Sequence, residues 1–177
     1  AAYSAMLAAI RADRTPNLFA LHYDAYEWIA CNLFLIPRFA FPLSAIHRRK
    51  PLAPTARRAG WVGCDILLDR IPTDARILII TNGAVESARS VRRQYGLLRP
   101  LAKIKPNLRG WTLDVLTAVR SLGKQEFSLP DAYSLEKNLF RLHPANRNIR
   151  PKIRQQLQIL RDAGLLTFLG NGRYLLR

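Results

Sequence analysis

The chain has 177 residues, of which 28 are lysine or arginine and 12 are aspartate or glutamate, so its formal net charge is +16. Hydrophobic residues make up 49% of it, which is enough to bury a core and excludes a disordered basic tail. The most apolar stretch, Trp28–Pro37, is far shorter than the ~20 residues that a membrane span requires, which excludes a transmembrane protein. With only 2 cysteines the chain is not a disulfide scaffold, and we expect a reduced, cytoplasmic protein.

The acidic residues are unevenly distributed, and three long windows contain none of them: residues 28–64, 87–113 and 137–161. A solvated surface normally mixes both signs of charge, so these windows favour a polyanionic partner, nucleic acid, over a generic basic surface. Prolines interrupt the first two windows, whereas a helix that binds a membrane surface needs an unbroken amphipathic stretch. Arginine outnumbers lysine, which favours bidentate contacts to phosphate or guanine over diffuse attraction.

The first part of the sequence predicts an α/β domain built around apolar strands. Residues 50–64 contain two prolines and two glycines, which predicts a long loop, and long loops in compact domains usually carry function. Trp28 begins an apolar run and is expected in the core. In chain order we expect a helix at 1–14, strands at 17–23, 28–37, 39–46, 65–68 and 76–81, a turn at Asn82–Gly83, a helix at 85–95 and a linker at 100–109.

After Gly110 the pattern changes from strands to helices. A helix from Thr112 has Leu113, Leu116 and Val119 at helical spacing, and the elements that follow are a short strand, two further helices and two apolar runs around a glycine-rich turn. Their expected ranges are 126–129 for the strand, 130–142 and 146–162 for the helices, and 165–169 and 173–176 for the apolar runs. Helix, strand, helix, helix and hairpin is the order of a winged helix.

The last of these helices predicts two faces. At 100° per residue, Ile153, Leu157 and Leu160 fall on one apolar stripe. A separate polar face consists of Arg150, Arg154, Gln155, Gln158 and Arg161. Such a face suits insertion into a DNA major groove, where arginine reads guanine and glutamine reads adenine, although a solvated surface helix is the simpler alternative.

Two blocks of sequence resemble a known family. KPLAPTARRAGWVGCDI at 50–66 and IRPKIRQQLQILRDAGLL at 149–166 are similar to the Dam-replacing, or DpnI, family of methyl-directed type II restriction endonucleases. The order of the intervening segments is similar too, including RGWT at 109–112 and the final GNGRY. The resemblance implies a PD-(D/E)XK nuclease domain, here partial, at 1–108 and a winged-helix domain at 109–177. It also implies double-stranded DNA with N6-methylated adenine in GATC as the partner.

The resemblance and the charge pattern together give a set of expected DNA-binding residues. Trp61 and Trp111 match family tryptophans that lie near the adenine methyl groups. There the face of the indole can make a favourable apolar contact with the methyl group. A buried core position is the alternative for either one. The full expected set is Arg57, Arg58, Trp61, Arg109, Trp111, Arg150, Arg154, Gln155, Gln158, Arg161 and Arg173.

The sequence departs from the family pattern in its catalytic chemistry. Nucleases of this class hold Mg²⁺ with carboxylates and orient the attacking water with a lysine two residues after an acid, and no acidic residue here precedes a lysine at that spacing. The family's zinc-binding cysteine cluster is missing as well, and the three histidines are far apart. We therefore expect no catalytic or metal-binding residue, and a monomer that binds DNA without cutting it. A winged-helix transcription regulator is the alternative, and a structural RNA-binding protein is a third possibility.

Overall fold

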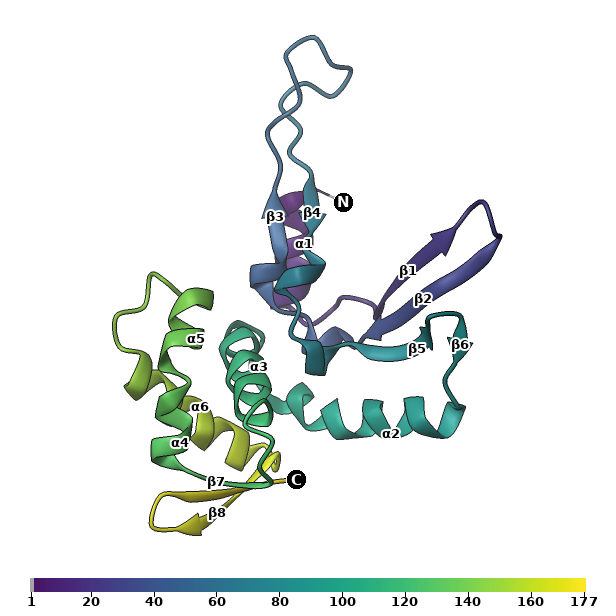
Figure 1. The fold of residues 1–177 in the computed structure, drawn as a ribbon. Coiled ribbons are helices and arrows are strands. Elements are labelled where there is room, and N and C mark those ends of the chain that lie inside the picture. Colours follow the sequence, from purple (N-terminus) through teal and green to yellow (C-terminus); the bar gives the residue numbers. More distant parts are fainter. Residues whose placement is uncertain (1) are drawn as a thin grey trace.

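Antiparallel strands dominate the first half of the protein (Figure 1). The computed structural model describes residues 2–177. Four strands form a sheet in the order β1-β2-β5-β6, while β3 and β4 form a separate ribbon. In chain order the elements are α1 (Tyr3–Arg11), β1 (Leu18–Asp24), β2 (Ile29–Ile36), β3 (Ile46–Arg48), β4 (Cys64–Ile66), β5 (Ile77–Thr81), β6 (Ala84–Val85) and α2 (Ala88–Leu98).

The long loop predicted at 50–64 is confirmed. Residues 49–63 project from the β3–β4 ribbon well beyond the body of the molecule (Figure 1). The loop is held to itself by backbone hydrogen bonds, including those from the N–H groups of Leu52 to the Trp61 carbonyl and of Gly60 to the Leu52 carbonyl. The loop is therefore an internally hydrogen-bonded projection that holds its arginines and Trp61 away from the body of the protein.

Trp28 was expected in the core, and this prediction is wrong. Its side chain is 82% exposed at the tip of the β1–β2 hairpin, where its φ is 55°. The Asp24 carboxylate accepts hydrogen bonds from the backbone N–H groups of Tyr26 (2.8 Å) and Glu27 (3.1 Å) and so turns the chain before Trp28. Local turn chemistry thus overrides the apolar character of the indole at this position.

Two further boundaries differ from the prediction. Residues 39–45 form no strand, because Pro37 and Pro42 each precede a 3₁₀ turn, at Arg38–Ala40 and Leu43–Ala45. Val85 lies in β6, and α2 begins only at Ala88, after the Ser87 side chain accepts a hydrogen bond from the N–H of Ser90.

The expected linker at 100–109 is also mostly helical. A 3₁₀ helix at Arg99–Lys103 leads directly into α3 (Pro106–Arg120). Pro106 suits the first turn of a helix because the N–H that it lacks would have no partner there. The helix therefore starts well before Thr112, and Arg109 and Trp111 lie inside it.

The winged-helix order is confirmed in the remainder of the chain. Its small sheet has the order β7-β9-β8, and the one helix expected at 130–142 is divided in two at Leu135. Ser128 and Asp131 form a capping box at the start of the first of the two. The elements are β7 (Glu126–Ser128), α4 (Leu129–Ser134), α5 (Glu136–Leu142), α6 (Ile149–Asp162), β8 (Leu166–Gly170) and β9 (Arg173–Leu176).

Helix α3 joins the two halves into one core. Its Leu113, Leu116 and Val119 are fully buried, as their spacing predicts. On one side α3 contacts α5 and α6, and on the other it contacts α1 and the 3₁₀ turns of the first half. The buried apolar residues of both halves accordingly form a single cluster. No helix within residues 2–177 is long and apolar enough to cross a membrane.

Candidate nucleic-acid interface

Helix α6 has the two faces that its sequence predicts. Ile153, Leu157 and Leu160 are at most 1% exposed and anchor the helix against the core. The opposite face is open to solvent and lines a shallow pocket with residues from α4 and α6, namely Tyr133, Arg150, Pro151, Arg154, Gln155 and Gln158. The structure thus brings together four of the expected DNA-binding side chains on one face of this helix.

Three exposed arginines of the expected set have an acidic neighbour. Arg150 Nε lies 2.7 Å from Glu136 Oε2, Arg161 Nη2 lies 2.9 Å from Asp162 Oδ1, and Arg173 pairs with Glu126. Ion pairs between exposed side chains contribute only about 0–1 kcal/mol, so a phosphate can replace the carboxylate. Arg161 lies outside the shallow pocket, one turn beyond Gln158, and Arg173 follows the turn between β8 and β9.

Trp111 lies beside this face, packed but not enclosed. Its indole stacks on the His143 ring, with centroids 3.6 Å apart and an interplanar angle of 14°. His143 donates through Nε2 to Asp114 Oδ2 at 2.7 Å, which fixes the imidazole. Lys152 Nζ lies 5.8 Å from the indole centroid and donates to Gln155 Oε1 at 2.8 Å. Trp111 is therefore connected to the polar face of α6 through Lys152.

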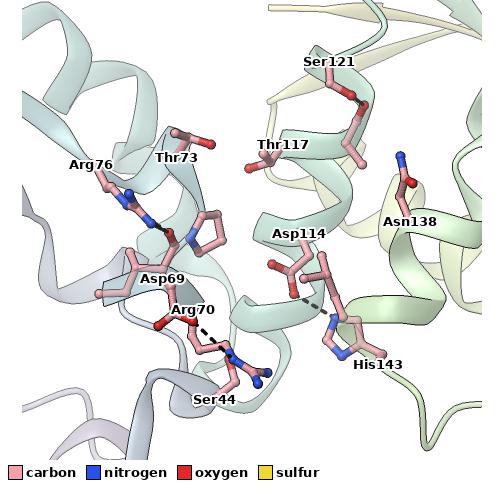
Figure 2. Close-up of a pocket in the computed structure, with 14 residues that line it drawn as sticks. Ser44, Asp69, Arg70, Thr73, Arg76, Asp114, Thr117, Ser121, Asn138 and His143 are labelled. Atoms are coloured by element: carbon pink, nitrogen blue, oxygen red, sulfur yellow. Dashed lines mark hydrogen bonds and ion pairs between the residues drawn. The ribbon is translucent and has the colours of Figure 1, made fainter. Parts of the chain in front are cut away.

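A pocket of about 270 Å³ lies behind this stack, between α3, α5 and the turns of the first half (Figure 2). Asp114 and His143 form part of its wall. On the facing wall the Arg76 guanidinium donates to the backbone carbonyls of Leu68 and Ile71, so its charge is used in holding those turns. Asp114 and His143 are 13% and 18% exposed, and no residue of α6 lines this pocket.

Sequence reasoning did not identify Lys152 or His143. Lys152 had a signal, because it falls within the acid-free window 137–161 three residues before Gln155. His143 had none, since its partners Trp111 and Asp114 lie on a different helix and its position beside them depends on the packing of α5 against α3.

The projecting loop forms a second surface, separate from α6. Arg57 and Arg58 are exposed, and neither forms an ion pair with any residue of 2–177. The Trp61 side chain is 37% exposed and folds back over Gly63. A Cβ on Gly63 would lie 2.8 Å and 2.9 Å from two carbons of the indole ring, so only glycine permits this position of the ring.

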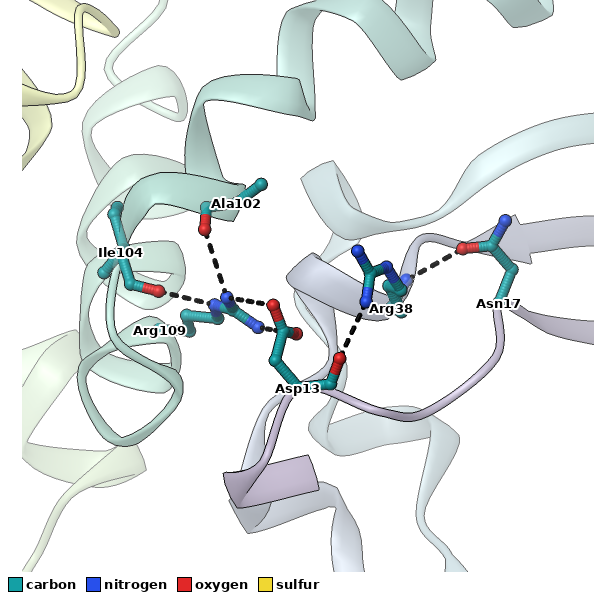
Figure 3. Close-up of polar contacts among 6 residues, drawn as sticks. All are labelled: Asp13, Asn17, Arg38, Ala102, Ile104 and Arg109. Atoms are coloured by element: carbon teal, nitrogen blue, oxygen red, sulfur yellow. Dashed lines mark hydrogen bonds and ion pairs between the residues drawn. The ribbon is translucent and has the colours of Figure 1, made fainter. Parts of the chain in front are cut away.

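Arg109 was expected to bind DNA, and the structure corrects this. The side chain is 2% exposed, and its guanidinium forms a bidentate ion pair with Asp13, at 2.8 Å and 3.2 Å (Figure 3). It also donates to the carbonyls of Ile104 at 2.8 Å and Ala102 at 3.3 Å. The hydrogen bond from Arg109 lowers the pKa of the Asp13 carboxyl below its usual value. Arg109 therefore joins the two halves of the protein and does not reach a ligand.

Comparison with family models agrees with this architecture. Residues 1–104 match the DpnI model, described as the Dam-replacing family. The chain belongs to the Dam-replacing family. Residues 107–175 match the Dam-replacing HTH domain, which begins with α3 and includes α6 and the wing, so this DpnI-like restriction endonuclease family places a DNA-binding domain where the winged helix lies.

The metal sites of the Dam-replacing family can be tested against the side chains present. Among residues 2–177 no three His, Cys, Asp or Glu side chains converge in a group that could hold a metal ion. Cys31 lies in β2 of the four-stranded sheet and Cys64 lies in the separate β3–β4 ribbon. The two thiols therefore lie on different sheets, and the described residues contain no such ligand group around either of them.

Proposed function

We propose that this chain is the reading part of a methyl-directed restriction endonuclease and that it binds GATC duplexes whose adenines carry N6-methyl groups. The observation that carries the proposal is the exposed arginine and glutamine face of α6 with the stacked Trp111 beside it. In the major groove, glutamine pairs with the adenine edge and arginine with the guanine edge, and these are two of the bases of GATC.

The two tryptophans supply the contact to the methyl group. An N6-methyl group is apolar, so burying it against an indole face gains about 0.8 kcal/mol, or about fourfold in affinity. Trp111 lies on the winged helix and Trp61 on the projecting loop, so each surface provides one such contact. Two methyl groups would then give about 15-fold discrimination between fully methylated and unmethylated duplex. One chain carries both readers, and we propose that it acts as a cytoplasmic monomer.

We propose further that the chain on its own binds DNA without cutting it. This rests on the lack of any acid followed two residues later by lysine in the sequence, and on the scattered positions of the carboxylates within residues 2–177. The positive surface supplies affinity for the phosphate backbone, which is independent of sequence, and base and methyl contacts supply the specificity.

Fluorescence anisotropy with labelled duplexes tests the proposal. We expect Kd to increase in the order fully methylated, hemimethylated and unmethylated GATC, at a fixed salt concentration. Equal affinity for the three would refute methyl reading. Incubating the protein with methylated supercoiled plasmid and Mg²⁺ tests the second part, because any nicking above a no-protein control would show that cleavage residues are present.

A further inference from the structure

Helix α2 carries a basic face that none of the contacts above uses. Arg89, Arg92 and Arg93 lie at 0°, 300° and 40° around the helix at 100° per residue, so they share one side. All three are exposed, and none forms an ion pair with any carboxylate of residues 2–177. They differ in this respect from Arg150, Arg161 and Arg173, each of which has an acidic neighbour.

The opposite side of α2 is fixed against the protein. Leu98 is 3% exposed, Val91 and Tyr95 pack against the core, and Tyr95 meets Phe39 edge to face with centroids 5.4 Å apart. The apolar side of α2 is therefore packed against the core and is not free to insert into a bilayer surface, which makes a membrane a poor partner for this helix. The helix instead holds three guanidinium groups outward on a rigid support.

Gly96 lies on the same side of the helix, at 340° on this scale, one turn beyond Arg92 and Arg93. A glycine inside a helix costs about 0.5–1 kcal/mol relative to alanine, and packing within the protein does not require one here, because a Cβ would meet nothing within 4 Å. The missing side chain allows a close approach to the helix backbone directly beyond the arginines. A duplex edge is a ligand that could make this approach.

We propose that the basic face of α2 binds the phosphate backbone of duplex DNA outside the sequence read by α6. Arg89 and Arg93 are separated by about 6 Å along the helix axis, which is close to the rise of two nucleotides of one strand. The inference rests on the proposed function in one respect, since the chain must bind duplex DNA. It adds a contact that is independent of methylation and that lengthens the footprint.

The test replaces all three arginines by glutamine, which keeps helix propensity. Kd is measured between about 50 and 200 mM salt on duplexes of about 12 and about 30 base pairs that contain methylated GATC. On the long duplex we expect the slope of log K against log salt to become shallower by about 2–3, at about 0.9 for each phosphate that the variant no longer neutralises. On the short duplex we expect the wild-type slope. A control variant with the same reduction of charge, at exposed positions outside α2, carries glutamine at Arg11, Arg14 and Arg70.

Several results would overturn the proposal. These are a slope equal to that of the control variant, an equal change on both duplex lengths, or a wild-type protein that binds RNA duplex of about 30 base pairs as tightly as DNA. Absence of methyl discrimination in the wild-type protein would refute the proposed function instead, and the salt slope on any long duplex would still test the α2 contact. Circular dichroism and urea unfolding confirm that each variant folds.

Discussion

Replacing Arg109 by methionine separates a structural role from a DNA contact at this residue. Methionine keeps much of the buried length of the side chain and removes the guanidinium. The change leaves Asp13 without its bidentate partner. It also removes the hydrogen bonds that the carbonyls of Ile104 and Ala102 accept from Arg109 in the wild-type protein, at 2.8 Å and 3.3 Å. Almost all contacts of the guanidinium are with other protein groups and not with water, because the arginine side chain is only 2% exposed.

The magnitude follows from burial. Breaking a buried ion pair by removing one partner costs about 3–5 kcal/mol. The Asp13 side chain is 33% exposed, so water recovers part of its hydration and the expected loss of stability is at the lower end, about 3 kcal/mol. For a protein of this size each kcal/mol lowers the melting temperature by about 2–4 °C, so we expect a fall of about 6–12 °C.

Urea and thermal unfolding followed by circular dichroism measure the stability, and anisotropy measures DNA affinity well below the lowered melting temperature. The ratio of affinities for methylated and unmethylated duplex should be unchanged. Asp13→Asn removes the charge of the other partner. Its amide oxygen still accepts a hydrogen bond, but the buried Arg109 guanidinium loses its counter-charge, so we expect a loss of stability of similar size and an unchanged affinity ratio. A variant of Arg109 with normal stability and strongly reduced DNA affinity would refute the structural assignment.

Three further predictions concern the same features. Asp13 has a lowered pKa in the folded state, so wild-type protein should be more stable than Asp13→Asn above about pH 4. Urea midpoints should show this difference decreasing as the pH falls through the folded-state pKa. Between the unfolded-state and folded-state pKa values only the unfolded chain binds the proton, which favours unfolding. Gly63→Ala should push the Trp61 indole away, shifting its fluorescence and reducing methyl discrimination by a few-fold in anisotropy assays; unchanged discrimination would show that this ring position is unimportant. His143→Gln should weaken the Trp111 stack and lower the methylated-to-unmethylated affinity ratio by about 2–4-fold, whereas His143→Phe should retain it, and equal ratios in both would contradict a positioning role.

Periodic features could be predicted from sequence because they are local. The apolar stripe of Ile153, Leu157 and Leu160 and the polar face opposite it depend only on helical spacing, and burial of the stripe confirms the prediction. The winged-helix order was visible for the same reason, since each helix and the glycine-rich turn has its own sequence signal.

Arg109 shows why other features could not be predicted. Within an acid-free window it resembles any other basic residue, and its partner Asp13 lies 96 positions earlier in the chain. Only the packing of α1 and α3 brings the two together. The prediction for Trp28 was wrong for a different reason. Its apolar character favours burial, but nothing in that residue itself indicates the turn that Asp24 stabilises just before it. The stack of Trp111 on His143 likewise depends on two helices meeting.

The position of α3 has a consequence for dissecting the protein. The family matches divide the chain between residues 104 and 107, just before a helix that is buried on both of its sides. A fragment beginning at Pro106 would expose apolar surface of α3 and retain Arg109 without Asp13. The two halves are therefore matched by separate family models but share one hydrophobic core. Exchanging the winged helix for that of a relative would require transplanting the residues facing α3 as well.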